Sequence, residues 1–226
     1  MDADPDILVN DPDVRRIQPR QKLYPWYRLQ NYYVPVLYGV LGVKTRIQDV
    51  TMYLNKLNDR IRINKMCAIE RNIFIGGKVF FLFYRFVLPW LAGFSISSIL
   101  TSFIISDLTT SYYLAFSFQA NHVTESCEVI ESKPLINDDW VNHQLRTTQD
   151  YAHTDASTTF LVGALNYQAI HHIAPDVHQY FYPKIRQVVF DFCKKKGMKF
   201  MHDETFTIAI SNHFTYLYKM GQAKQD

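Results

Sequence analysis

The chain of 226 residues has little cysteine and little net charge. Its three cysteines, Cys67, Cys127 and Cys193, lie far apart and outside any Cys-x-x-Cys pattern, which disfavours a zinc knuckle or a disulfide framework. The formal net charge is only +3, and no run of lysine or arginine alternates with base-stacking residues, so nucleic acid is not an expected partner. Residues 1–13 are acidic, unlike a secretory signal, so internal segments would have to carry any membrane insertion.

The sequence does contain one long apolar region. Residues 73–118 carry only Lys78, Arg85 and Asp107 as charged residues, and residues 86–106 form an uncharged stretch of 21 residues. Because about 20 apolar residues span a bilayer, the region is about two spans long. It predicts a transmembrane hairpin with helices near residues 75–95 and 98–119, turning over residues 93–98. The alternative is an apolar helix pair buried in a soluble protein.

The distribution of basic residues favours the membrane interpretation. Of the 24 lysines and arginines, 12 lie between Arg15 and Arg71, as in a cytosolic flank. Residues 32–43 are apolar but too short to span, which indicates an interfacial or re-entrant piece. Residues 44–72 alternate apolar and basic positions and predict an amphipathic helix lying on the membrane surface.

These patterns predict a mainly α protein, an integral-membrane helical hairpin with a cytosolic helical cap. We divide the chain into a cytosolic or interfacial segment (residues 1–72), the hairpin (73–119) and a cytosolic segment (120–226). In the last segment we expect a helix over residues 157–173 with Ser157 or Thr158 as its cap. A second helix should cover residues 183–196 and stop at Gly197, and a third should cover residues 204–219 with Asp203 as its cap.

Three residues of the first of these helices point to metal chemistry. Gln168, His171 and His172 occupy positions i, i+3 and i+4, which share one helix face. Adjacent histidines diverge by about 100° around a helix axis, which suits two neighbouring ions better than one. Imidazole with open coordination positions suits iron, whereas structural zinc favours cysteine. The alternative is a pair of exposed or backbone-bonded histidines.

His122 supports the metal interpretation because it lies near the cytosolic end of the second predicted span. The other five histidines have no helical partner at ligand spacing, so we expect structural or exposed roles for them: His143, His153, His178, His202 and His213.

The order of several motifs resembles the C-terminal half of front-end fatty-acyl desaturases, especially the delta-5 type of amoebae. The motifs are Asp-Pro-Asp-Ile (4–7), the apolar hairpin, Asn-His-Val (121–123), Trp140 with Gln144-Leu145, Asn166-x-Gln168-x-x-His171-His172, and Pro175. The resemblance covers nearly the whole chain. It implies that Gln168, His171 and His172 are the family's third histidine box and that His122 is the metal ligand following the last span. Many members have Ile-Glu where this chain has Ala169-Ile170, and Phe-Pro where it has Ala174-Pro175. Both departures adjoin the presumed ligands without replacing them.

The resemblance also implies an activity. Front-end desaturases insert a cis double bond between an existing one and the carboxyl end of a polyunsaturated acyl chain, using two iron ions, dioxygen and electrons from NADH through cytochrome b5, fused or separate. The implied partners are fatty acyl-CoA or a phospholipid acyl chain, together with membrane lipid. The implied location is the endoplasmic reticulum membrane, crossed more than once, with both termini cytosolic.

The sequence lacks other features of this family. No His-x-x-x-His or His-x-x-His-His box precedes the third box, and the His-Pro-Gly-Gly motif of cytochrome b5 is absent. We therefore expect a fragment or a truncated gene model, and a chain that is inactive by itself. Two alternatives are a non-catalytic membrane remnant and a related di-iron lipid hydroxylase, and Gln168 at the start of the third box favours front-end desaturation.

Overall fold

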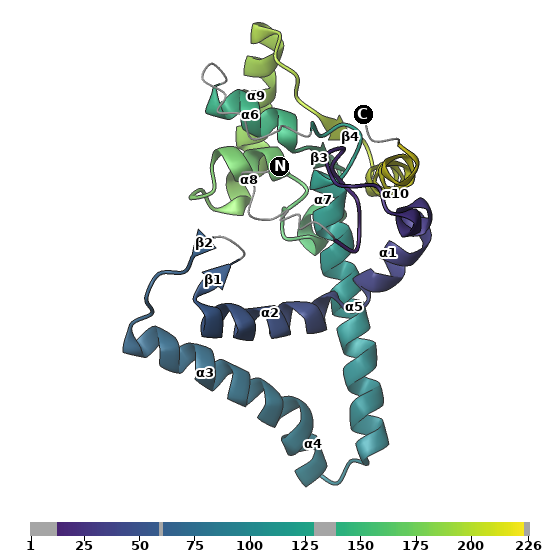
Figure 1. The fold of residues 1–226 in the computed structure, drawn as a ribbon. Helices are drawn as coiled ribbons and strands as arrows, with labels where there is room; N and C mark the ends of the chain where they lie inside the picture. Colours follow the sequence, from purple (N-terminus) through teal and green to yellow (C-terminus); the bar gives the residue numbers. More distant parts are fainter. Residues whose placement is uncertain (1–12, 59–60, 129–138, 224–226) are drawn as a thin grey trace. The chain divides into compact units, whose positions relative to one another are not determined.

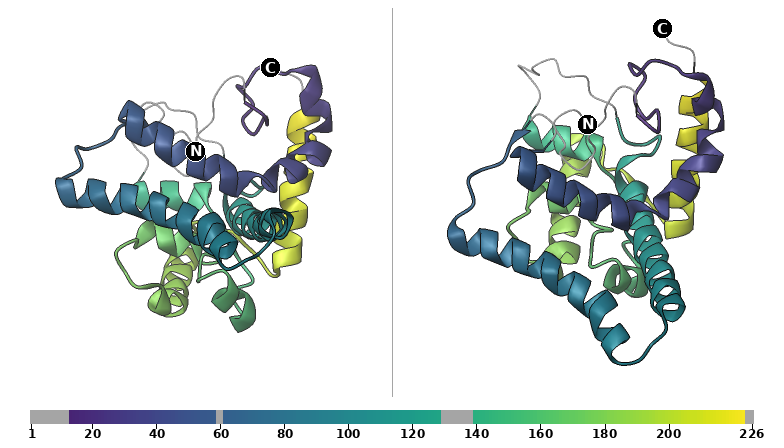
Figure 2. Two further views of the ribbon diagram at one scale, coloured as in Figure 1. Left: turned by 90° about the horizontal axis from the view of Figure 1, so that it is seen from below. Right: turned by 60° about the horizontal axis from the view of Figure 1, so that its bottom comes forward.

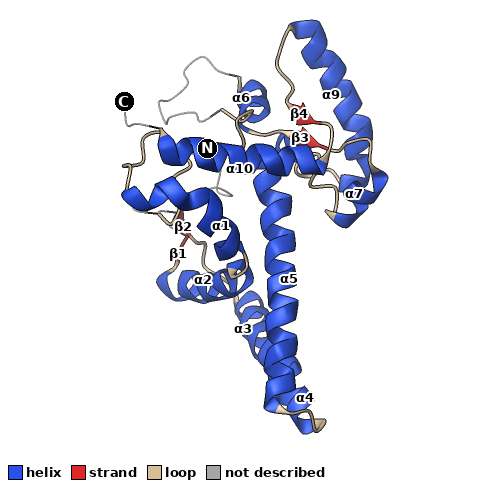
Figure 3. Ribbon diagram, turned by 90° about the vertical axis from the view of Figure 1, so that its right-hand side faces the viewer, coloured by secondary structure: helices blue, strands red, loops and turns tan. Residues whose placement is uncertain are grey.

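The computed structural model describes residues 13–58, 61–128 and 139–223, so the Asp-Pro-Asp-Ile motif (4–7) lies outside the described residues. The chain forms two compact units. We call residues 37–113 the hairpin unit, and residues 1–36 with 114–226 the histidine unit. Helices predominate in both, and the strands are only two residues long (Figures 1 and 3).

The hairpin unit consists of helices with a short β-hairpin between α2 (Leu41–Asn55) and α3 (Ala68–Leu82). The elements are α2, β1 (Leu57–Asn58), β2 (Ile61–Arg62), α3, the π-helical turn η2 (Phe83–Val87), α4 (Leu88–Leu91) and the first part of α5 (Ile96–His122). β1 and β2 pair antiparallel. A further helix, α1 (Gln30–Tyr38), crosses from the histidine unit into this one.

The predicted apolar hairpin is confirmed. Among the described residues, two helices are long and apolar enough to cross a membrane, Ala68–Leu91 and Ile96–His122. No residue of the most apolar part of the first is buried, whereas a core helix of a soluble protein would be mostly buried. The turn between them contains Gly93 at φ +88°, a backbone conformation that favours glycine.

The single amphipathic helix predicted over residues 44–72 is wrong. Helix α2 ends at Asn55, where Lys56 adopts the left-handed conformation, and the β-hairpin follows. The asparagines and β-branched isoleucines in this stretch favour turns and strands over a continuous helix. Helix α3 then starts afresh at a capping box, in which the Cys67 sulfur accepts from the Glu70 amide and the Glu70 carboxylate accepts from the Cys67 amide.

The histidine unit contains the remaining elements. They are η1 (Pro25–Leu29), α6 (Trp140–Thr147), β3 (Asp150–Tyr151), α7 (Ala156–Leu161), α8 (Gln168–Ile173), η3 (Gln179–Phe181), α9 (Tyr182–Lys196), β4 (His202–Asp203) and α10 (Phe206–Gln222). β3 and β4 pair in parallel although about 50 residues separate them. The predicted helix over residues 183–196 is confirmed as α9, and Gly197 ends it at φ +68°.

Two other sequence predictions for this unit are wrong in detail. The helix expected over residues 157–173 is broken into α7 and α8, because Gly163 and Ala164 both adopt positive φ and the Asn166 side chain bonds to the Tyr151 and Ala152 carbonyls. Asp155, rather than Ser157 or Thr158, caps α7. Helix α10 is capped by Thr205, while Asp203 belongs to β4 and accepts from Asn212 and Gln149.

The start of the described chain packs on α10 (Figure 2). Arg16 is fully buried and donates to the carbonyls of Met220 and Ala223, and the Gln30 amide donates to the Leu217 carbonyl. Gly221 permits this approach, because a Cβ there would lie 2.2 Å from the Tyr27 carbonyl oxygen. The N-terminal segment and α10 are therefore packed together within the histidine unit.

Candidate metal centre

The C-terminal end of α5 places His122 in the interior of the histidine unit. His122 is buried, and backbone carbonyls on both sides of it are held by polar groups from distant segments. The Gln149 amide side chain donates to the Ala120 carbonyl at 2.8 Å, and the Gln149 backbone donates to the Asn121 carbonyl at 3.1 Å. His213 of α10 bonds to the Val123 carbonyl at 2.7 Å. These contacts fix the last turn of a helix that would otherwise fray.

Helix α8 brings the predicted third box to His122. The His172 and His122 rings lie 5.3 Å apart between centroids, and the His171 and His172 rings lie 5.9 Å apart. The shared helix face predicted for Gln168, His171 and His172 is thus built on α8 itself, and His122 approaches from α5.

Neighbouring side chains orient both histidines of α8. His172 Nδ1 lies 2.9 Å from Gln144 Oε1 of α6, and His171 Nδ1 lies 3.1 Å from the Tyr182 hydroxyl of α9. Since Gln144 Oε1 is an acceptor, His172 Nδ1 carries the proton and Nε2 is the nitrogen that would bind a metal ion. Metal-binding histidines commonly donate a hydrogen bond of this kind from the ring nitrogen that does not bind the metal.

Gln168 is fully buried at the first position of α8. Its Oε1 accepts a hydrogen bond from Asn121 Nδ2 at 3.3 Å, and the same Asn121 amide donates to the Leu165 carbonyl at 2.8 Å. The residue before His122 is thereby tied to the first residue of the box, so α5 and α8 are joined through polar groups as well as through their histidine rings.

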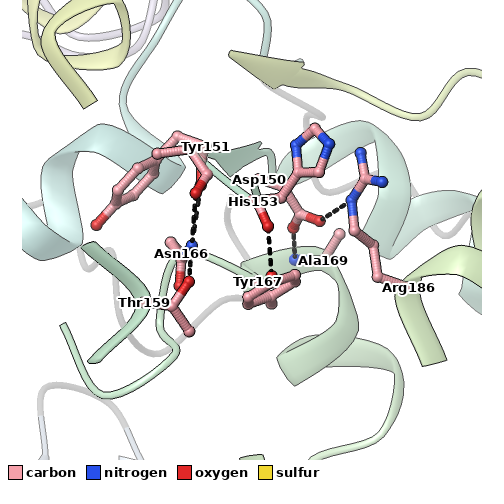
Figure 4. Close-up of polar contacts among 9 residues, drawn as sticks. Asp150, Tyr151, His153, Thr159, Asn166, Tyr167, Ala169 and Arg186 are labelled. Atoms are coloured by element: carbon pink, nitrogen blue, oxygen red, sulfur yellow. Dashed lines mark hydrogen bonds and ion pairs between the residues drawn. The ribbon is translucent and has the colours of Figure 1, made fainter. Parts of the chain in front are cut away.

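A buried aspartate, Asp150, bonds to the first turn of α8. Asp150 of β3 has no exposed surface; its Oδ1 accepts from the Ala169 amide, and its Oδ2 pairs with Arg186 of α9 (Figure 4). Burial raises the pKa of Asp150 to about 7, against the lowering effects of the Ala169 amide and the Arg186 charge. Burial lowers the pKa of His213 to about 4, so His213 is neutral and donates from Nδ1 to the Val123 carbonyl.

The donors brought together suit part of a metal site. Among the residues that the structure describes, no three histidine, cysteine, aspartate or glutamate side chains are arranged to hold a metal ion. The His122 and His172 rings nevertheless lie 5.3 Å apart between centroids and His171 adjoins His172, while the Nδ1 contacts of the two α8 histidines would leave Nε2 for a ligand. The set fits iron ligands in type, and it needs further ligands to hold two ions.

The other histidines stand apart from this set. His213 is buried and structural, as expected, and His178 is exposed and accepts from the Tyr180 amide. His153 and His202 face each other with ring centroids 5.3 Å apart, and His143 is half-buried on α6.

Sequence patterns missed the supporting residues Tyr182, Asp150 and Arg186. Tyr182 lies 11 residues from His171, Asp150 lies 19 residues from Ala169, and Arg186 acts on α8 through Asp150, so no helical spacing links these residues to the box. Asn121 and Gln144 were recognised only as part of the resemblance. The local sequence around Asp150, Thr147-Thr148-Gln149-Asp150-Tyr151, places the aspartate between polar residues and an aromatic residue. That was the one local signal for Asp150.

Comparison with known proteins identifies the family. The fatty acid desaturase family model matches residues 3–204. The acyl-lipid (8-3)-desaturase of Mortierella alpina is 40% identical over 97% of this chain and 50% of its own length, and the acyl-lipid (8-3)-desaturase B of Dictyostelium discoideum is 38% identical over 97% and 49%. The chain thus spans about half the length of these relatives. No solved structure matches it significantly. With its two apolar helices and this match, the chain is a membrane-associated protein that belongs to the fatty acid desaturase family.

Proposed function

We propose that this chain supplies part of the catalytic centre for front-end fatty-acyl desaturation, the insertion of a cis double bond on the carboxyl side of an existing one. The observation that carries the proposal is the meeting of His122 and His172, whose rings lie 5.3 Å apart on different helices. The relatives support the reaction type, since their names include acyl-lipid (8-3)-desaturase and Delta(5) fatty acid desaturase A. These names favour desaturation over hydroxylation.

His122, Gln168, His171 and His172 would be ligands of the two iron ions, with the remaining ligands coming from elsewhere. Iron, when bound, supplies an oxidant strong enough to remove hydrogen from an unactivated methylene with dioxygen and two electrons. The protein residues have simpler tasks. Gln144 and Tyr182 hold the two imidazoles by Nδ1, which would leave Nε2 of each ring for a metal ion.

The remaining parts of the proposal concern partners and location. An acyl chain, as the CoA ester or within a phospholipid, would be the substrate, and cytochrome b5 would pass electrons from NADH. The two apolar helices would cross the endoplasmic reticulum membrane and leave both termini in the cytosol. Glycosylation acceptors placed at either terminus should stay unmodified in this arrangement. Modification of an acceptor near residue 150 would contradict it.

Expression in yeast tests the activity. The N-terminal half of the Mortierella alpina relative would be joined before Met1, and the cells would be fed a polyunsaturated precursor. We expect a new double bond in the lipid profile from the chimera. The 226-residue chain alone should give none, because its ligands are too few for two irons. A hydroxylated product would support the hydroxylase alternative, and an iron-free, inactive chimera would support the non-catalytic one.

A further inference from the structure

Helix α8 is too short to hold its own position. It has six residues, and its N-cap residue Tyr167 makes no side-chain capping bond. A helix of this length is unstable alone, because nucleation is unfavourable and the amides of the first turn have no partners within the helix. The direction of Gln168, His171 and His172 must therefore be set by groups outside α8.

Asp150 supplies the missing cap from a distance of 19 residues in the chain. Its Oδ1 accepts the Ala169 amide at 3.0 Å, which places a carboxylate at the positive end of the helix dipole. The backbone of Asp150 is itself fixed, because its amide donates to the Met201 carbonyl and β3 pairs with β4. The capping carboxylate is therefore attached to a backbone segment that is itself held by hydrogen bonds.

Arg186 of α9 completes the arrangement (Figure 4). Its Nε lies 3.4 Å from Asp150 Oδ2, a pairing of charges without hydrogen-bond geometry, and both side chains are buried. The guanidinium also lies over the Phe190 and Phe200 rings, at 5.2 and 5.3 Å. Breaking such a buried pair by removing one partner leaves the other charge uncompensated.

Helix α9 acts on α8 directly through Tyr182 and indirectly through Arg186, and the two residues lie on one face of α9. Tyr182 and Arg186 are four residues apart and so project from the same side of α9. Tyr182 bonds to the His171 ring, while Arg186 acts on the first turn of α8 through Asp150. A shift of the pair would therefore turn the box residues relative to His122.

We propose that Asp150 and Arg186 are positioning residues that fix the start of α8 and thereby the directions of Gln168, His171 and His172. That these directions matter for binding iron rests on the proposed function. That Asp150 and Arg186 hold α8 in place does not rest on it, so the positioning role and the proposed function can fail separately.

Hydrogen exchange of the purified 226-residue chain in detergent tests the placement. Asp150→Ala should raise exchange in residues 168–173 by about tenfold or more and leave α10 unchanged. Asp155→Ala is the matched control: Asp155 also caps a six-residue helix, α7, by accepting the Ser157 amide. It should raise exchange in α7 only. Unchanged exchange in residues 168–173 of Asp150→Ala would overturn the proposal.

Two further variants separate positioning from general loss of structure. Arg186→Met alone should loosen α8, whereas Arg186→Met with Asp150→Asn should restore it, because the asparagine still accepts the Ala169 amide and no buried charge is left unpaired. If Asp150→Ala raises exchange throughout the chain, the double variant distinguishes positioning from general unfolding. Restored protection of residues 168–173 in the double variant supports the proposal, and exchange raised throughout the chain overturns it.

Iron content separates this inference from the proposed function. In the yeast chimera, Asp150→Ala should lower iron occupancy or activity by about 10–100-fold, the range found when a residue that holds a metal ligand in place is removed, and the double variant should recover most of it. If the unsubstituted chimera holds no iron while exchange responds as predicted, the proposed function fails and the positioning role stands.

Discussion

Apolar side chains face outward in the hairpin unit, whereas polar side chains are buried in the histidine unit. Ile73 and Leu91 of the first span are 70% and 65% exposed, while Gln149, Asp150 and Asn166 of the histidine unit have no exposed surface. The first pattern suits lipid as the surrounding solvent. The second is unfavourable unless the polar groups are bonded, and two of them bond to the segments that carry the histidines: Gln149 to the Ala120 carbonyl and Asp150 to the Ala169 amide.

The largest expected effect lies where the histidine unit is most tightly packed. In Gly221→Ala, the new methyl group would meet the Tyr27 carbonyl at 2.2 Å, and a backbone atom cannot move aside as a side chain could. We expect a loss of about 3 kcal/mol or more, the upper end for overpacking. Thermal unfolding in detergent measures it. Gly76→Ala is a suitable control, because a Cβ added there has no atom within 4 Å. Gly197→Ala would not serve as the control, because the positive φ of Gly197 would itself strain an alanine.

The buried His213 makes the same unit sensitive to acid. Its pKa is about 4 in the folded protein and 6.5 unperturbed, so between these values the unfolded state binds more protons. The free energy of unfolding should therefore fall as the pH falls from 6.5 to 4, by about 3 kcal/mol. Asp150, with its raised pKa, contributes the opposite slope, so the comparison with His213→Gln isolates the histidine. Equal pH slopes in both proteins would contradict this account.

A partly buried ion pair joins α5 to α2 in the hairpin unit. Asp107 of α5 is only 6% exposed and pairs with Arg46 of α2, whose guanidinium lies over the Phe81 ring; nearby, the Gly42 amide donates to the Ser111 hydroxyl. Because the Arg46 side chain is about one-third exposed, we expect Asp107→Ala to lower stability by only about 1–3 kcal/mol. Asp49→Ala, which removes a more exposed ion pair with Lys78, should have less effect.

The smallest effect should come from the outward apolar face. Val79 of α3 is 60% exposed, and truncation of a side chain that contacts lipid in both states changes folding little. Val79→Ala should alter stability by less than about 0.5 kcal/mol in bicelles. A loss above about 2 kcal/mol would show that this face packs against protein.

The features that could be predicted from sequence are those with a local signal. Length and apolarity predicted the hairpin, and the i, i+3, i+4 spacing placed Gln168, His171 and His172 on one helix face. The break at Gly163 and Ala164 was missed because its cause is partly tertiary: Asn166 bonds to the β3 strand and the residue after it. Asp150 and Arg186 were missed because a buried ion pair between distant segments leaves no periodic pattern.

Iron content of the yeast chimera tests the central claim, that His122 and the α8 histidines form one part of a metal centre. His172→Ala removes the ring that faces His122, so iron and product should be lost while protein abundance stays nearly unchanged. Gln168→His should be milder because it supplies another nitrogen ligand. His202→Ala, on an exposed residue outside the set, should retain iron. Full iron and activity in His172→Ala, with loss of both in His202→Ala, would show that the site lies elsewhere.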